Sequence, residues 1–525
     1  MTASARLAIR QIRRGWLIVL VLVSALSAIV VVQYRYTFTD PAEVASLGVL
    51  ARNPAIRVLF GVPLALDSAG GFTVWRTGTF AAVTVASWGL LVATQITRGE
   101  EQAGRWALLL TGRHRLPSVV VHHLAVLLGT QMIMGSALAV SLIAAGAGTR
   151  GALIYGAGIA LVGALFVAVG TWCAQLVDDR RTASGIATAF LGVGLLMRMV
   201  ADGAEQLAWL AWLTPFGLLA EAEPYAANRL LPLAVLVMMV FAAAGLTVLA
   251  AAHRDVGSGL ITGATTRPGR FRLLRSLPGF AIRRTLPSAL GWAVGLGAYF
   301  LLIGLLARSL TDFLAANPRF AELAAEAGFA GLTSVQGYAA ALFALLAIPL
   351  GVFAASRLGV DAADEAQGRL AAVFSRPLSR SRWSLVHLVV LVVFVVALAA
   401  TAGVAAVAGA TLANANLQLT EALAGTLNVV PVAALCLGAA QLAMGWMPRA
   451  VLAVGAMPAA GGFLLTVLTQ TFGWPEWLGQ LSPFAHLASV PATSPNWAGA
   501  AGMMGIAAVF AGLGIAGFVS RDLRG

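Results

Sequence analysis

Apolar residues occur in long runs along the whole sequence, separated by segments that carry most of its charges. A membrane-spanning helix needs roughly 20 mostly apolar residues, and the runs are about this long. They are continuous rather than alternating, which predicts helices and not the strands of a barrel. The runs are 16–32, 78–96, 119–145, 152–177, 182–200, 230–252, 288–306, 335–356, 384–409, 422–446, 450–470 and 497–519. We therefore predict an all-α integral membrane protein with twelve transmembrane helices.

The composition is typical of a protein whose surface is covered largely by lipid. Of the 525 residues, 59% are hydrophobic and 10% are charged, whereas a soluble domain has about a quarter of its residues charged. All the basic residues are arginines, and 25 of the 34 fall on the side that holds both termini when the span number is even. The positive-inside rule places that side in the cytoplasm. Because these arginines lie mostly in short loops beside anionic lipid, the net charge of +13 does not indicate a nucleic-acid partner.

Short motifs recur at a nearly constant distance along the chain. The pairs are Asn53-Pro54 with Asn317-Pro318, Glu101 with Glu365, Gly104-Arg105 with Gly368-Arg369, His123-Leu124 with His387-Leu388, Pro215-Phe216 with Pro483-Phe484, and Arg254-Asp255 with Arg521-Asp522. The first four pairs share one and the same separation, and the last two pairs differ from it by only a few positions. We conclude that the chain is a tandem duplication of a six-helix unit. Both copies begin on the cytoplasmic side, so the repeats are parallel.

The duplication suggests four segments. Residues 1–15 carry arginines on one helical face and apolar residues on the other, which favours an interfacial amphipathic helix over a solvated basic tail. Residues 16–252 form the first transmembrane half and residues 288–525 the second. The basic stretch 253–287 joins them and contains a second interfacial helix, because Phe280–Arg284 resembles Leu7–Gln11.

The sequence restricts how such a protein could be driven. A P-loop needs a lysine in the pattern G-x-x-x-x-G-K-[ST], and the chain has no lysine. If ATP provides the energy, another polypeptide hydrolyses it. An ion-coupled carrier would need ionisable groups well inside its spans. Glu421 and Asp361 lie near span ends. So do Arg198 and Arg308, whose side chains can extend outward to water.

Candidates for catalysis or metal binding are few. His122, His123 and His387 lie at the inner ends of spans without the spacing of a metal site such as H-E-x-x-H. Asp40 and Glu43, in the first outer loop, are a weak candidate pair for a membrane glycosyltransferase. We therefore predict that the chain is not itself an enzyme and binds no metal or cofactor.

The inner loops after the second span of each half, residues 97–110 and 364–374, are more informative. Each combines acids, a Gly-Arg pair and an apolar segment of helical spacing. A short amphipathic helix in such a loop can dock onto a cytoplasmic partner, with acids at its beginning and an arginine later. A solvated loop with ordinary cytoplasmic arginines remains the alternative.

At these loops the chain resembles the ABC-2-type transporter permeases, in particular their duplicated twelve-helix branch of polyketide antibiotic and tetronasin exporters. That family carries E-x-x-x-G, a leucine-rich stretch and often a proline after the second span. The matching residues are Glu100, Glu101, Gly104 and 108–110, then Glu365, Gly368 and Pro377. The outer segment Gly70–Arg76 and the Arg-Asp pairs after the sixth and twelfth spans also resemble that branch. The first loop has Gly112-Arg113 where a proline is common, and the second half lacks the Gly70–Arg76 pattern.

The resemblance implies two parallel six-helix repeats of the type V exporter kind, in a bacterial plasma membrane. It implies a permease that moves hydrophobic or amphiphilic compounds out of the cell, with two copies of a cytoplasmic ATPase that bind ATP and Mg²⁺. The implied ATPase-coupling residues are Glu100, Glu101, Gly104, Arg105, Asp178, Arg180, Arg181, Asp364, Glu365, Gly368, Arg369 and Pro377. The implied outer re-entrant segments, 209–225 and 474–491, include Trp209, Trp212, Pro215, Phe216, Trp474, Trp477, Pro483 and Phe484. An ion-coupled drug carrier and a membrane-embedded lipid-modifying enzyme remain the alternatives.

Overall fold

We describe the protein from a computed structural model, which covers residues 3–37, 57–58, 60–111, 115–261, 276–318, 330–375, 377–472 and 474–522. Within these residues, twelve helices are long and apolar enough to cross a membrane, and each matches one of the predicted spans. The described residues contain no β-strand. The predicted all-α membrane fold is therefore confirmed. Asp40, Glu43, Asn53-Pro54, Arg113 and part of the linker, 262–275, lie outside the described residues.

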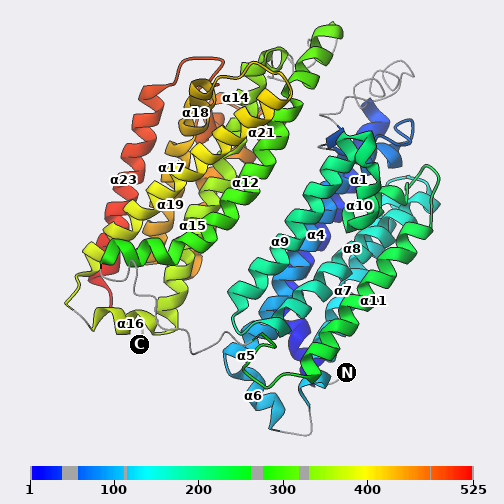
Figure 1. Ribbon diagram of the computed structural model, residues 1–525, viewed down its shortest axis with the longest axis horizontal. Coiled ribbons are helices and arrows are strands. Elements are labelled where there is room, and N and C mark those ends of the chain that lie inside the picture. The colour runs from blue at the N-terminus through cyan, green and yellow to red at the C-terminus, as the bar shows by residue number, and fades with distance from the viewer. Residues whose placement is uncertain are drawn as a thin grey trace. The chain divides into compact units, whose positions relative to one another are not determined.

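The chain divides into two compact units, Met1–Arg267 and Pro268–Gly525, and each holds six of the twelve candidate spans. The division falls within the linker predicted for residues 253–287. Figure 1 shows that the long helices of each unit, taken by itself, run side by side along its length.

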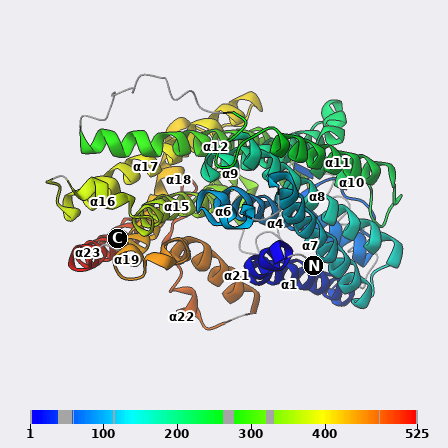
Figure 2. The same ribbon diagram turned by 90° about the horizontal axis from the view of Figure 1, so that it is seen from below.

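In the first unit, the fourth span is the most enclosed, with 78% of its apolar window buried. It is α8, and α4, α7, α9 and α11 pack around it. α1 packs on α7 and α4 (Figure 2). The helices are α1 (Ala3–Thr37), α4 (Ala69–Thr94), α7 (Leu116–Ala144), α8 (Thr149–Leu176), α9 (Arg180–Gly203) and α11 (Leu231–Ala252). Glycines allow α7 and α8 to meet closely, because a Cβ at Gly135 would lie 2.2 Å from the Gly156 carbonyl oxygen.

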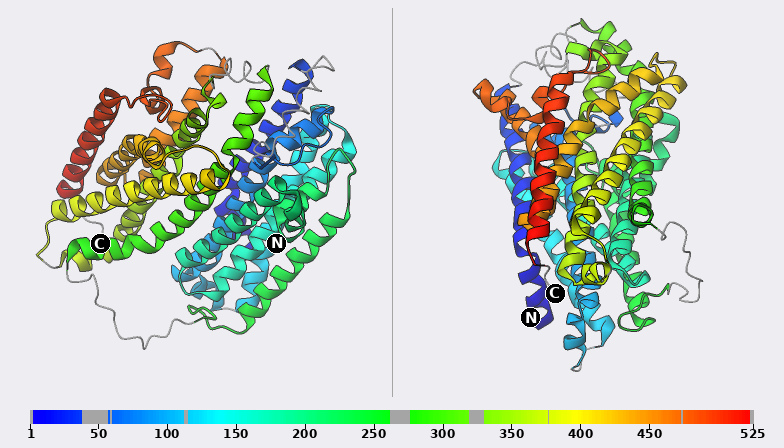
Figure 3. Two further views of the ribbon diagram at one scale, coloured as in Figure 1. Left: turned by 45° about the horizontal axis from the view of Figure 1, so that its top comes forward. Right: turned by 90° about the vertical axis from the view of Figure 1, so that its left-hand side faces the viewer.

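The second unit has the same pattern around its own fourth span, in which α19 packs against α15 and α23 (Figure 3). Three of its spans are interrupted near prolines, Pro349, Pro431 and Pro458, which lack a backbone donor. Its main helices are α12 (Leu277–Ala316), α14 (Val335–Leu345), α15 (Ala347–Ala366), α17 (Arg380–Leu412), α18 (Leu419–Asn428), α19 (Val430–Trp446), α20 (Val451–Ala456), the π-helical turn η6 (Met457–Gly461), α21 (Gly462–Phe472) and α23 (Trp497–Ser520).

The two helices predicted as separate interfacial segments are continuous with the spans that follow them. α1 has no break near residue 15, so residues 3–15 are its first turns. Gly15 costs only about 1 kcal/mol relative to alanine in a helix, which does not by itself end one. Likewise α12 begins at Leu277 and continues through Pro287. That these turns lie at the membrane interface stays a prediction.

The two halves begin their second span in the same way, although their sequences differ there. Ser68 accepts a hydrogen bond from the Gly71 amide at the start of α4, and Ser334 accepts one from the Gly337 amide at the start of α14. A Cβ at either glycine would collide with a backbone carbonyl oxygen, at 2.1 Å and 1.8 Å. The pattern S-x-x-G therefore recurs at nearly the separation of the other repeated motifs, and it persists where the Gly70–Arg76 motif does not.

The predicted outer segments between the fifth and sixth spans contain short helices. The first half has the 3-10 helix η2 (Glu205–Leu213) and α10 (Pro215–Glu221), and the second has α22 (Glu476–Gly479) and the 3-10 turn η7 (Pro483–His486). The tryptophans are exposed, namely Trp209, Trp212, Trp474 and Trp477. Pro215 and Phe216 are buried, whereas Pro483 and Phe484 are half-buried. A re-entrant or gating role stays a prediction.

Candidate functional site

The loop after the second span of the first unit turns on a left-handed glycine. α4 continues through the π-helical turn η1 (Gln95–Gly99) into α5 (Glu100–Gln102), and α6 (Arg105–Leu110) follows. Gly104, between α5 and α6, has a φ of 73°, and its amide donates to the Glu101 carbonyl oxygen at 3.0 Å. Because residues with a Cβ rarely adopt this conformation, glycine is required for the short helix α6 to begin at this angle.

The second unit repeats this turn. α15 ends at Ala366, Gly368 has a φ of 71°, and the short helix α16 (Arg369–Phe374) follows. The Gly368 amide donates to the Glu365 carbonyl oxygen at 2.9 Å. Each loop thus contains a short helix, but this helix begins at the arginine, whereas the acids predicted at its beginning belong to the preceding helix. Figure 1 shows α5 and α6 at the same end of the first unit as the N-terminus.

Glu101 is buried and forms two ion pairs. Its carboxylate receives two hydrogen bonds from Arg254, at 2.6 and 2.7 Å, and lies 3.1 Å from Arg98. The Gly257 amide donates to it as well, at 2.8 Å. A carboxylate that accepts a bidentate pair from arginine and a backbone amide is strongly held. We call Glu101 and Arg254 the first latch.

The first latch joins three segments of the unit. Arg254 follows the end of α11, and its Nε also donates to the Gln175 side chain near the end of α8, at 2.9 Å. Glu101 belongs to the loop after α4. The loop is therefore fixed to the ends of the fourth and sixth spans, and a displacement of α6 acts on both.

The second unit has an equivalent pair, which we call the second latch. Glu365 lies 2.6 Å from Arg521, which follows the end of α23, and Arg521 also donates to the Met444 carbonyl oxygen at 2.9 Å. The first latch has an additional arginine, Arg98, whose counterpart is Ala362 when Glu101 is aligned with Glu365. The two latches therefore differ by one buried arginine.

A second ion pair in each loop links the acid before the latch to the arginine after the glycine. Glu100 accepts from Arg105 at 2.5 and 2.6 Å, and this hydrogen bond raises the pKa of Arg105. Asp364 pairs with Arg369 and with Arg284. Arg105 and Arg369 are about half exposed, at 59% and 52% of their side-chain surface, so they are available to a partner.

In the first unit, the segment that holds the implied coupling residues Asp178, Arg180 and Arg181 lies against the loop after α4. The Gln102 side chain donates to the Asp178 carbonyl oxygen at 2.8 Å and accepts from the Arg180 amide at 3.3 Å. The Asp178 carboxylate accepts from the Gly259 amide. Arg181 is exposed, as are Pro377 and Arg449 in the second unit.

The acids of the two loops occupy a different position from the one the sequence suggested. Glu100, Glu101, Asp364 and Glu365 are 3–8% exposed, so they position the loops instead of forming the docking surface. Leu108, on α6, is 77% exposed and can form part of such a surface. The sequence identifies Glu101, Glu365 and both Arg-Asp pairs as repeated motifs. It does not predict that each glutamate contacts the arginine of an Arg-Asp pair.

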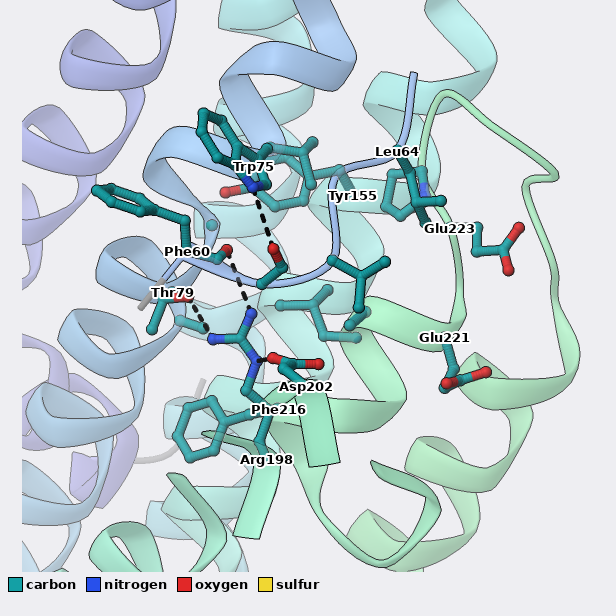
Figure 4. A pocket seen from close by; sticks show the side chains of 18 of the residues that line it. Phe60, Leu64, Trp75, Thr79, Tyr155, Arg198, Asp202, Phe216, Glu221 and Glu223 are labelled. Carbon is teal, nitrogen blue, oxygen red and sulfur yellow. Dashed lines mark hydrogen bonds and ion pairs between the residues drawn. The ribbon is translucent and has the colours of Figure 1, made fainter. Parts of the chain in front are cut away.

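Arg198 differs from its prediction. It is 5% exposed and does not extend to water. Its Nε lies 2.5 Å from Asp202, and its other nitrogens donate to Thr79 at 2.6 Å and to the Phe60 carbonyl oxygen at 3.3 Å (Figure 4). The spacing of four residues puts Arg198 and Asp202 on one helical face, a signal that could have predicted the pair. Arg308, in contrast, is exposed as predicted.

The described residues show no group of three His, Cys, Asp or Glu side chains that could hold a metal ion. His123 and His387 bond to the carbonyl oxygens of Val119 and Trp383, four residues earlier, at 2.8 and 2.9 Å. Both histidines also contact tryptophan rings, Trp106 and Trp383. These contacts fit a packing role.

Comparison with known proteins adds a second line of observation. Residues 274–519 match the family model described as "Multidrug efflux system permease Rv1217c, C-terminal domain". The chain is 29% identical to the multidrug efflux system permease protein Rv1217c of Mycobacterium tuberculosis, over 96% of this chain and 92% of that protein. The chain is similar to an efflux permease from end to end. Because its described residues include twelve helices that are long and apolar enough to cross a membrane, it is a multi-pass membrane protein.

Proposed function

We propose that the chain is the membrane subunit of an ATP-driven exporter of hydrophobic or amphiphilic compounds, and that two copies of a cytoplasmic ATPase bind its loops. The observation that carries the proposal is the duplicated loop, in which a left-handed glycine starts a short helix and a buried ion pair fixes it to the spans. The likeness to a multidrug efflux permease supports the transported class. The ATP and Mg²⁺ belong to the partner.

Each loop can transmit a push from the partner to the bundle. The partner would contact the exposed residues of α6 and α16, such as Leu108, Arg105 and Arg369. Because Glu101 binds Arg254 and Glu365 binds Arg521, the ends of the fourth and sixth spans would move with the loop in each half. ATP-driven closure of two ATPase subunits would thereby change the pathway for the compound.

Copurification tests the partnership. The tagged chain should retain a soluble subunit with a Walker motif, and Leu108→Asp should reduce the amount retained at least fivefold. Leu412→Asp is the matched control, because Leu412 is also exposed, at 71%, but lies at the far end of α17 from Arg380. Equal retention by the two variants would remove α6 from the docking surface.

Transport in proteoliposomes separates the proposal from its alternatives. The reconstituted complex should export a drug with ATP when an ionophore has dissipated the proton gradient. Transport that stops with the gradient and ignores ATP would instead identify an ion-coupled carrier. Chemical turnover of labelled lipid by the purified chain would identify a lipid-modifying enzyme.

A further inference from the structure

A cavity of about 160 Å³ lies within the first unit, at the end away from the first latch. It is bounded by the first turns of α4, Tyr155 of α8, the last turns of α9 and the segment that contains α10 (Figure 4). Its apolar wall includes the rings of Phe60, Trp75 and Phe216. An aromatic wall with a few polar groups at defined places is the usual composition of a site for a small molecule.

The charged groups at this cavity are paired with one another. Asp202 pairs with Arg198, at 2.5 Å, and Glu223 pairs with Arg229, at 3.1 Å. Glu221 lies 4.0 Å from the same Arg229, and Arg57 acts electrostatically on Asp202. Three acids thus line the cavity, and three arginines act on them, of which only Arg198 lines the cavity itself. A balanced set offers little net attraction to an ion, whereas the polar edges of the Arg198–Asp202 pair can hydrogen-bond a neutral group.

Burying such a pair carries a desolvation cost, which is offset only when the two charges are well paired and hydrogen-bonded. Arg198 and Asp202 lie in the last turns of α9, near the end of the span, and both are buried there. Ionisable residues that are buried within spanning helices mark functional sites by default. Arg198 is held on three sides, by Asp202, by Thr79 of α4 and by the Phe60 carbonyl oxygen. The pair therefore forms a fixed polar wall and not a mobile ion.

The second half does not repeat this wall. At the separations of the repeated motifs, Arg198 and Asp202 correspond to positions within 462–470, which contain no charged residue. Thr79 corresponds to Leu345 when Ser68 is aligned with Ser334. The two halves therefore share their latches and differ at this site.

We infer that the cavity of the first half, and not its counterpart in the second, binds a neutral compound with a flat aromatic body and a hydroxyl or amide group. The aromatic body lies against Trp75 and Phe60, and the polar group meets the Arg198–Asp202 pair. This inference rests on the proposed function in one respect, namely that the compound bound in the cavity is also the compound that is exported. The site thus lies inside one half of the protein.

Filling the cavity tests the inference directly. A Cβ at Gly78 would have no neighbour closer than 3.8 Å, so Gly78→Ala, Gly78→Val and Gly78→Leu fill the space stepwise without a backbone collision. Ala344→Leu is the matched control, because Ala344 is the counterpart of Gly78 in the same alignment of the two halves. The probe is 1-naphthol, and 1-naphthalenesulfonate is the charged analogue. Binding to the purified chain in nanodiscs is measured by equilibrium dialysis against protein-free nanodiscs.

We expect saturable binding of 1-naphthol to the wild type and to Ala344→Leu, with at least tenfold weaker binding by Gly78→Leu and intermediate values for the smaller replacements. The sulfonate should bind the wild type at least tenfold more weakly than the naphthol. Unchanged binding across the Gly78 series, an equal loss in Ala344→Leu, or equal affinity for the sulfonate would overturn the inference. If Gly78→Leu does not fold, the Ala and Val variants decide. No ATPase is present, so failure here is separate from failure of the proposed function.

Discussion

Glu101 and Arg254 lie 153 residues apart in the chain, yet their side chains meet at 2.6 Å and are almost completely buried. Glu365 and Arg521, separated by 156 residues, make the same contact in the second unit. Each half is therefore closed at one end by an ion pair between the loop after its second span and the segment after its sixth. This duplicated contact explains why the Glu and Arg-Asp motifs recur together.

Glu101→Gln should destabilise the protein strongly. Removing one partner of a buried pair leaves the other charge uncompensated and costs about 3–5 kcal/mol, and here both Arg254 and Arg98 would lose their carboxylate. Thermal unfolding of the purified variant in detergent measures the loss. Glu365→Gln should cost less, because Arg521 is 21% exposed. Equal losses in the two variants would contradict the unequal latches.

Gly104→Ala and Gly368→Ala should each lower stability by about 1–2 kcal/mol, the cost of placing an alanine in the left-handed region. Neither glycine has an atom within 4 Å of its Cβ position, so the backbone conformation alone carries the effect. Gly129→Ala, inside α7 and equally open, is the control and should be neutral or stabilising. Melting temperatures of the three variants should therefore separate clearly.

Gly151→Ala should be destabilising because Tyr225 packs directly against that glycine. A Cβ at Gly151 would lie 2.3 Å from the Tyr225 ring, and one at Gly70 would lie 2.2 Å from it. The ring thus lies between α4 and α8 and packs against both. We expect a loss of about 1–3 kcal/mol, as for other overpacked sites. In the double variant with Tyr225→Gly, Gly151→Ala should add almost nothing; additive losses in unfolding assays would refute the contact.

The stability difference between Glu221→Gln and the wild type should depend on pH. Burial raises the pKa of Glu221, opposed by Arg229. An acid whose pKa is raised on folding destabilises the folded state once pH rises above its unfolded value. The variant should therefore melt above the wild type at pH 7 and coincide with it near pH 4. A Glu221→Gln variant that melts with or below the wild type at pH 7 would contradict the prediction.

The sequence predicts the spans well because each is a long apolar run, which a bilayer requires. The repeat spacing also identifies Glu101, Glu365 and both Arg-Asp pairs as equivalent positions. It does not show that the acids and arginines meet, because the partners are separated by four spans and only the folded bundle brings them together. Their burial follows from that contact, so the prediction placed them on the surface.

Two other differences have local causes. The end of the predicted helix at residue 15 rested on a change of residue type, from arginine-rich to apolar, but a helix is not broken by such a change. The outward-pointing Arg198 was predicted from its nearness to a span end, without its partner Asp202 four residues later. Gly61 shows the same limit, because a Cβ at this position would collide with the Arg198 guanidinium, a contact that only the folded structure reveals.

The unbroken course of α1 has a mechanical consequence. Its 35 residues correspond to a rod of about 52 Å at 1.5 Å per residue. Near its far end, Tyr34 donates to the Leu66 carbonyl oxygen at 2.8 Å, and Arg35 donates to the Ala145 carbonyl oxygen at 3.2 Å. No break in α1 separates these hydrogen bonds from the arginines of its first turns. A tilt of α1 imposed at one face of the membrane is therefore transmitted to the opposite face.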